Sequence, residues 1–187
     1  MLTYIICGVI CLFIWVVSLI PAIKERFASE IYGHTGMALF FTLLVLGFGI
    51  PRLGNIFPDI LWIEIIGYVL FIPAAFLVAS SFIGLFRKGK ARTLSPSDKM
   101  TLVDTGIYGV VRHPMLLGMA VWSFALILVF QSALSIVLGV IAIFLSWMAA
   151  REEDKVNQKK FGTSYKKYMI MVPRWNAFKG LMGLRKG

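Results

Sequence analysis

Five long apolar segments constrain this chain more than any other feature of its sequence. A helix needs about 20 apolar residues to cross a hydrocarbon core of about 30 Å. The candidate spans are residues 2–20, 35–50, 60–86, 114–130 and 133–150. Hydrophobic residues make up 59% of the chain and charged residues only 15%, which excludes an ordinary soluble globule. The sequence therefore predicts an all-α membrane protein with five transmembrane helices.

The basic residues predict how these spans are oriented. Cytoplasmic loops of membrane proteins carry an excess of Lys and Arg. With the N-terminus outside, the inner segments 21–34, 87–113 and 151–187 hold 18 of the 19 Lys and Arg residues. The C-terminus is therefore expected in the cytoplasm. The net charge of +10 is expected to attract anionic lipid headgroups, and it does not indicate nucleic acid.

The last two predicted spans form a hairpin that leads into the C-terminal region. Only Gln131 and Ser132 separate them, which predicts a tight antiparallel turn. Neither Gly nor Pro occurs between Arg151 and Lys160, so the fifth helix is expected to continue to Phe161 and to end at Gly162.

A shorter helix is expected next, because apolar residues recur there at helical spacing. Such a stripe predicts an amphipathic helix at the membrane interface. Its members are Tyr165, Tyr168, Met169 and Val172.

The chain is expected to form one integrated domain with two unequal parts. Residues 1–86 contain three spans and little polar chemistry, and are expected to act as a scaffold. Residues 87–187 contain a polar loop, the hairpin and a basic C-terminal region. Candidate functional residues are therefore sought in the second part.

The first candidate is Arg112-His113-Pro114, at the start of the fourth span. Proline suits the first helical turn, and the free N–H groups there attract anions. Arg112 adds a permanent cation, and His113 adds a group that titrates near neutral pH. The alternative is that Arg112 anchors the helix at the interface and His113 only caps it.

The second candidate is Glu152-Glu153-Asp154, directly after the fifth span. Three acids beside the negative end of a membrane helix oppose the preference of the helix dipole. A local rule is often broken at a functional site. The alternative is pairing with Arg151, Lys155 and Lys159 on a helix that continues into water.

The third candidate is Pro173-Arg174-Trp175, where the chain is expected to return toward the membrane. The alternative is an ordinary basic and aromatic anchor at headgroup level. No HExxH, CxxC or Walker pattern occurs, so no metal site is indicated. Cys7 and Cys11 lie on one helix face inside an apolar segment.

In their order and spacing these features resemble a known group of integral-membrane methyltransferases. The group includes the isoprenylcysteine carboxyl methyltransferases and the phospholipid methyltransferases. The resemblance covers about residues 100–176 and is carried by Leu102-Val103-x-x-Gly106-x-Tyr108-x-x-x-Arg112-His113-Pro114-x-x-x-Gly118, Glu152-Glu153, Phe161-Gly162-x-x-Tyr165-x-x-Tyr168 and Pro173-Arg174-Trp175.

The resemblance implies S-adenosylmethionine as methyl donor, bound at the cytoplasmic face. Arg174 is hypothesised to orient the methyl acceptor, which makes it the candidate catalytic residue. The cofactor-binding residues that the resemblance implies are Leu102, Val103, Tyr108, Arg112, His113, Pro114, Glu152 and Glu153.

The expected activity is methyl transfer to a lipidic or small hydrophobic acceptor that enters from the membrane. A prenylcysteine-like carboxylate is one candidate, because a carboxylate is already ionised at pH 7 and needs no general base. A thiol or a phospholipid amine is an alternative acceptor. A lipid-binding or assembly protein without enzymatic activity is the alternative from another class. The sequence leaves the acceptor and the oligomeric state open.

Overall fold

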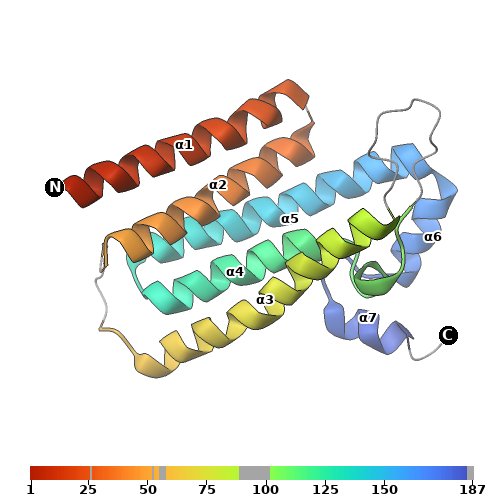
Figure 1. The fold of residues 1–187 in the computed structure, drawn as a ribbon. Helices are drawn as coiled ribbons and strands as arrows, with labels where there is room; N and C mark the ends of the chain where they lie inside the picture. The colour runs from red at the N-terminus through yellow and green to blue at the C-terminus, as the bar shows by residue number, and fades with distance from the viewer. Residues whose placement is uncertain (26, 52, 55–57, 89–101, 185–187) are drawn as a thin grey trace.

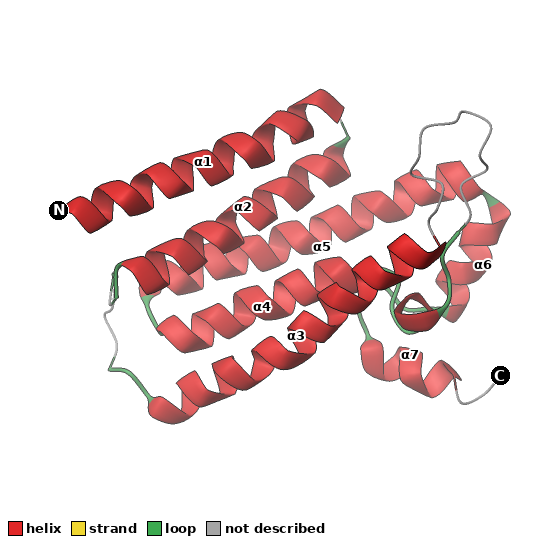
Figure 2. Cartoon of the chain, viewed as in Figure 1, coloured by secondary structure: helices red, strands yellow, loops and turns green. Residues whose placement is uncertain are grey.

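The computed structural model describes residues 1–187 except 26, 52, 55–57, 89–101 and 185–187. The described residues form α-helices and a short 3₁₀ helix, with no strand among them (Figure 2). In chain order the elements are α1 (Leu2–Glu25), α2 (Ala28–Gly49), α3 (Leu61–Lys88), η2 (Gly106–Gly109), α4 (Pro114–Phe130), α5 (Ala133–Phe161), α6 (Thr163–Met171) and α7 (Ala177–Leu184).

The five long helices lie side by side in an elongated bundle (Figure 1). Across the bundle the order is α1, α2, α5, α4 and α3, since α1 packs on α2, α2 on α5, α5 on α4, and α4 on α3. The short elements η2, α6 and α7 gather at one end of the bundle, which we call the α6 end. The short elements that the structure describes before α4 and after α5 therefore lie together at one end of an apolar bundle.

Four helices, α1, α2, α3 and α5, are long and apolar enough to cross a membrane. Their surfaces carry many exposed apolar side chains, such as Leu12, Ile72 and Phe76. Apolar patches of this extent are typical of a surface that contacts lipid. The all-α class is thus confirmed for the described residues, and four of the five predicted spans are candidate membrane spans in the structure.

The fifth predicted span, α4, has 17 residues and belongs to the shorter apolar helices. At 1.5 Å per residue it is about 26 Å long, slightly less than the hydrocarbon core. Its crossing of the membrane, like the orientation of the bundle, stays a prediction.

The predicted hairpin between α4 and α5 is confirmed. Gln131 takes the left-handed conformation with φ of 43°, and Ser132 and Ser135 cap α5 reciprocally through their hydroxyl groups and backbone N–H groups. The Gln131 amide also bonds to the backbone N–H and carbonyl of Ile60, both at 3.0 Å. The hairpin therefore also holds the start of α3.

The predicted length of α5 is confirmed as well, and it matters for the site. The helix runs without interruption to Phe161 and ends at Gly162, where φ is 58°. Its last three turns extend beyond the predicted membrane span, which ends at Ala150.

The helix predicted after Gly162 is present as α6, but its apolar stripe does not face the membrane. Tyr165, Tyr168 and Val172 are buried and pack with Leu102 and Phe161. The prediction of an interfacial stripe was wrong because the loop before α4 folds over this side of α6 and covers it.

Small residues allow α3 and α4 to approach closely. A Cβ atom built at Gly67 would lie 2.9 Å from the carbonyl oxygen of Ala125 and 3.0 Å from the backbone nitrogen of Val129. Both atoms belong to the α4 backbone and cannot rotate away. Small residues at such contacts are typical of helix packing in membranes.

We expect Gly67→Ala to lower the free energy of unfolding by about 1–3 kcal/mol, because the added methyl group forces the two backbones apart. Gly8→Ala is the matched control, since a Cβ atom at Gly8 meets no atom within 4 Å. The measurement is the thermal unfolding midpoint of the purified protein in detergent. Equal midpoints for the two variants would contradict the close approach of α3 and α4.

Candidate functional site

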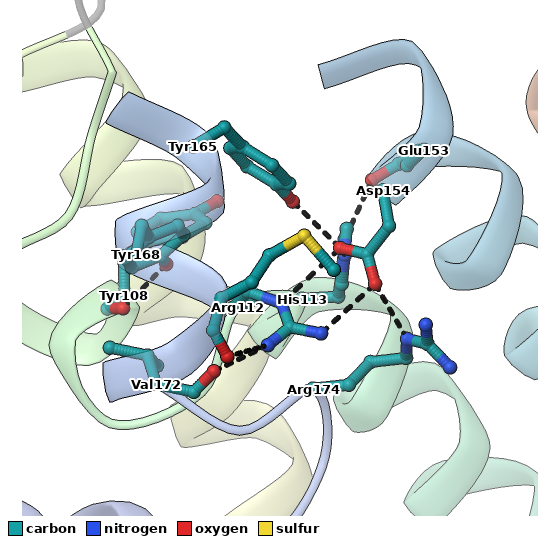
Figure 3. A network of polar contacts seen from close by, with 10 residues as sticks. Tyr108, Arg112, His113, Glu153, Asp154, Tyr165, Tyr168, Val172 and Arg174 are labelled. Atoms are coloured by element: carbon teal, nitrogen blue, oxygen red, sulfur yellow. Dashed lines mark hydrogen bonds and ion pairs between the residues drawn. The ribbon is translucent and has the colours of Figure 1, made fainter. Parts of the chain in front are cut away.

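Four segments meet at the α6 end: the loop before α4, the last turns of α5, the helix α6, and the chain that follows it (Figure 3). Pro114 occupies the first turn of α4, as its fixed φ favours. His113 is the N-cap residue of α4, and its side chain makes no capping hydrogen bond. The imidazole is therefore free to reach α5.

Asp154 is the centre of the polar network at this end. Its carboxylate is 1% exposed and accepts hydrogen bonds from four side chains (Figure 3). The donors are Arg112 through Nε at 3.2 Å and Nη2 at 3.0 Å, His113 through Nε2 at 2.8 Å, Tyr165 through its hydroxyl at 2.7 Å, and Arg174 through Nε at 2.8 Å. One carboxylate thus connects α5 to the α4 corner, to α6 and to the C-terminal chain.

Arg112 ties the end of α6 to the same corner. Its Nη1 donates to the carbonyl oxygen of Met169 at 3.0 Å and to that of Val172. Its backbone N–H donates to the carbonyl oxygen of Pro173 at 3.0 Å. Most donors of Arg112 are thus used inside the protein, which makes this residue a structural link.

His113 lies between two carboxylates. Nε2 contacts Asp154 at 2.8 Å, and Nδ1 contacts Glu153 at 2.9 Å. Carboxylates accept hydrogen bonds, so both ring nitrogens must carry a proton for both bonds to form. Burial alone lowers the pKa of His113, but the hydrogen bonds to Asp154 and Glu153 outweigh it and raise that pKa above its ordinary value. The two carboxylates therefore favour the imidazolium form of His113.

Asp154 is held ionised by the same contacts. Burial alone raises its pKa, but the hydrogen bonds from His113 and Arg112 lower that pKa far below the ordinary range. The same surroundings raise the pKa values of two nearby tyrosines. Burial raises the pKa of Tyr108 to about 12, although a hydrogen bond with Ser81 lowers it in part, and burial and the nearby Asp154 raise that of Tyr165. Both phenols are thus neutral, and neither is a base.

Two charged groups of the network keep part of their surface open. The Glu153 side chain is 38% exposed and uses one oxygen on His113. The Arg174 side chain is 23% exposed, uses Nε on Asp154, and lies over the ring of Trp147 at 4.8 Å. Part of each of these two side chains is therefore accessible to solvent.

The structure brings most of the predicted site residues together. Those in or next to the network are Tyr108, Arg112, His113, Pro114, Glu153 and Arg174. Leu102 packs on the Tyr165 cluster, and Val103 is half-buried in the same loop.

Glu152 lies outside the network. It pairs with Lys155 at 2.6 Å, one turn along α5, which is the helix-surface pairing considered as the alternative for this acidic run. Asp154 and Tyr165, in contrast, are central to the network, although neither was assigned to cofactor binding or catalysis from the sequence.

A signal for Asp154 does exist in the sequence. The buried face of α5 is a stripe of small residues at helical spacing that continues along the helix to Asp154. Its members are Ser135, Gly139, Ala142, Ser146, Ala149 and Ala150.

Comparison with known families yields a match that includes part of the α6 end. The family model described as phospholipid methyltransferase matches residues 62–164, which is 103 of the 187 residues. The chain belongs to the phospholipid methyltransferase family. The match includes the α4 corner and the acidic run of α5, and it ends before Tyr165 and Arg174. No curated protein and no solved structure matches the chain.

Membership confirms the resemblance seen in the sequence. The protein is a membrane methyltransferase, which sets aside the alternative without enzymatic activity. The family implies S-adenosylmethionine as the methyl donor and lipids as substrates.

We expect Asp154→Asn to lower the free energy of unfolding by about 3–5 kcal/mol, because it leaves Arg112, His113 and Arg174 without their common counter-charge. Glu152→Gln is the matched control on the same helix and should change it by less than about 0.5 kcal/mol. Thermal unfolding in detergent measures both. Equal midpoints for the two variants would contradict the central role of Asp154.

The raised pKa of His113 predicts a specific dependence of stability on pH. The stabilisation from the imidazolium is complete below about pH 6.5, the ordinary unfolded value, and is lost as the pH rises through the higher folded-state value. The stability difference between the parent protein and His113→Gln should therefore shrink on the alkaline side. Unfolding midpoints measured from pH 6 to pH 9 test this, and a difference that grows with pH would contradict the two-carboxylate arrangement.

Proposed function

We propose that this methyltransferase transfers a methyl group from S-adenosylmethionine to a lipidic or small hydrophobic acceptor at the cytoplasmic face of the membrane. The observation that carries the proposal is the meeting of the α4 N-terminus with Glu153 at the α6 end, within the region that matches the family. The cytoplasmic location follows from the distribution of basic residues in the sequence.

The chemistry of the residues present fits the donor. Its carboxylate suits the N–H groups of the first turn of α4, where His113 provides no side-chain cap. Its ammonium or ribose hydroxyl groups suit the second oxygen of Glu153, since hydrogen bonds to a charged acceptor are strong. We assign Leu102, Val103 and Tyr108, in the preceding loop, to the wall of the same site.

Arg112 and His113 support this site from within. Their donors are mostly used on Asp154, Glu153 and backbone carbonyls, so we assign them the role of holding the corner in place. Glu152 points away from the corner and has no part in the proposal.

S-adenosylmethionine supplies an electrophilic methyl group on a sulfonium. The protein then needs to align donor and acceptor and to exclude water. Arg174 is fixed by Asp154 and by the ring of Trp147, and its remaining N–H groups are available to orient an anionic acceptor. This is the role that we propose for Arg174 in catalysis.

The state of His113 favours an acceptor that needs no general base. Both of its nitrogens donate to carboxylates, so the ring cannot take a proton from an amine or a thiol without breaking a hydrogen bond. Tyr108 and Tyr165 are neutral and equally unsuited. A carboxylate acceptor, such as a prenylcysteine-like one, is thus the first candidate. A phospholipid amine is the second, since the family description names phospholipids.

We expect Glu153→Gln to weaken the binding of S-adenosylmethionine about tenfold or more, because it removes a charged acceptor from the donor site. Glu152→Gln, one residue away, should bind like the parent protein. Equilibrium dialysis with radiolabelled donor measures both affinities in the full-length protein. Equal affinities in the two variants would refute the placement of the donor beside Glu153.

Transfer itself is tested with the parent protein in lipid nanodiscs and a panel of acceptors. The panel contains prenylcysteine analogues, phospholipids with amine headgroups, and hydrophobic thiols. Label in the carboxylate acceptor supports the first candidate, and label only in the amine lipid supports the second. Absence of both transfer and donor binding overturns the proposal.

A further inference from the structure

The C-terminal helix α7 has one covered side and one bare apolar side. Phe178, Leu181 and Met182 lie at positions i, i+3 and i+4, so they share a face. Their exposed fractions are 73%, 55% and 48%. Gly180, in contrast, is buried. The eight-residue helix lies at the α6 end of the bundle (Figure 1). Its three large apolar side chains are thus exposed there.

The covered side shows that this orientation is built into the fold. A Cβ atom at Gly180 would overlap the carbonyl oxygen of Val110, so only glycine permits this contact. Asn176 fixes the start of the helix, since its side-chain oxygen accepts from the N–H of Lys179 at 2.9 Å and its carbonyl accepts from the N–H of Gly180 at 3.0 Å. The contact at Gly180 therefore fixes which face of α7 turns outward.

The charge of the C-terminal region indicates which surface the outward face of α7 contacts. From Lys155 to the end of the chain the sequence contains nine Lys and Arg residues and no Asp or Glu. Lys179 is exposed on α7 itself. An apolar helix face flanked by basic residues is the pattern that binds the interface of a bilayer with anionic lipids. We propose that α7 binds an anionic membrane surface through Phe178, Leu181 and Met182.

The membrane is favoured over a second copy of the chain for two reasons. Three side chains on an eight-residue helix offer far less than the area of about 800 Å² per partner that a stable interface buries. The spanning helices of the same chain also bring a bilayer next to this end of the bundle without any association step.

The same contact links the membrane to the candidate site. Gly180 touches Val110, two residues before Arg112, and the N–H of Arg112 bonds to Pro173, which precedes α7 in the chain. The position of α7 on the bilayer thus determines the position of the α4 corner. This link rests on the proposed function, because its readout is the affinity for S-adenosylmethionine.

The surface is tested by spin labels in full-length protein, on a Cys7→Ala, Cys11→Ala background in nanodiscs that contain anionic lipid. Single cysteines replace Leu181, Met182 and, as the matched control, Lys179. Labels at 181 and 182 should be relaxed by oxygen, which concentrates in lipid, and the label at 179 by a water-soluble nickel complex. Water exposure at all three positions overturns the proposal. So does spin–spin broadening that disappears on dilution with unlabelled protein, which indicates a second copy on this face.

The link to the site is tested by Gly180→Ala against Gly183→Ala, since a Cβ atom at Gly183 meets no atom within 4 Å. We expect Gly180→Ala to weaken donor binding about fivefold and Gly183→Ala to leave it unchanged. Equal affinities refute the link while the parent protein still binds the donor. Loss of donor binding in the parent itself refutes the proposed function and leaves the spin-label result as the test of the surface.

Discussion

The arrangement of the α6 end depends on the burial of one carboxylate. An ionised Asp154 is tolerated inside the protein only if the surrounding groups replace its hydration. Arg112, His113, Arg174 and Tyr165 do this, and they come from the α4 corner, the C-terminal chain and α6. The need to pair one charge therefore joins the α4 corner, which lies about 40 residues earlier in the sequence, to α6 and to the chain that follows it. Breaking the network leaves several cations unpaired at once, so its members are expected to act as a unit.

The length of α5 makes this arrangement possible. Had the helix ended with the apolar segment at Ala150, its three acids would lie at the negative end of the helix dipole. Because the helix continues to Phe161, the acids sit within it, and the dipole no longer opposes them. The extension also carries the acids outside the predicted span, where the loop before α4 and the helix α6 can close around them. The three further turns of α5 thus remove the conflict between the three acids and the helix dipole.

Much of this fold follows from periodicity and turn chemistry, which are local properties. The hairpin at Gln131, the end of α5 at Gly162 and the helical stripe of α6 were all readable in the sequence. The residues that cover each helix face, in contrast, come from distant parts of the sequence. The α6 stripe looked suited to lipid but packs on Leu102, because nothing in residues 163–172 encodes the return of a loop from 60 residues earlier.

The same limit explains why the acidic run alone does not single out Asp154. Glu152 and Asp154 are about 200° apart around a helix, so only one can face α4. Which one does so depends on the rotation of α5, and that rotation is set by its small residues against α2 and α4. Ala149 and Ala150 lie against Leu116 on α4, and Asp154 follows one turn later on the same side. The acidic run by itself does not contain this information, whereas the small-residue stripe before it does.

The dimensions of α4 connect the site to the membrane. At about 26 Å the helix is shorter than a hydrocarbon core of about 30 Å, while its neighbour α3 has 28 residues and is long enough to extend past it. With α4 across the membrane, as the sequence predicts, the α4 corner is expected at the depth of the lipid headgroups rather than in bulk water. An acceptor with a lipid tail could present its headgroup at this depth without leaving the bilayer. The site would then need no deep cleft of its own, because the lipid phase itself supplies one wall.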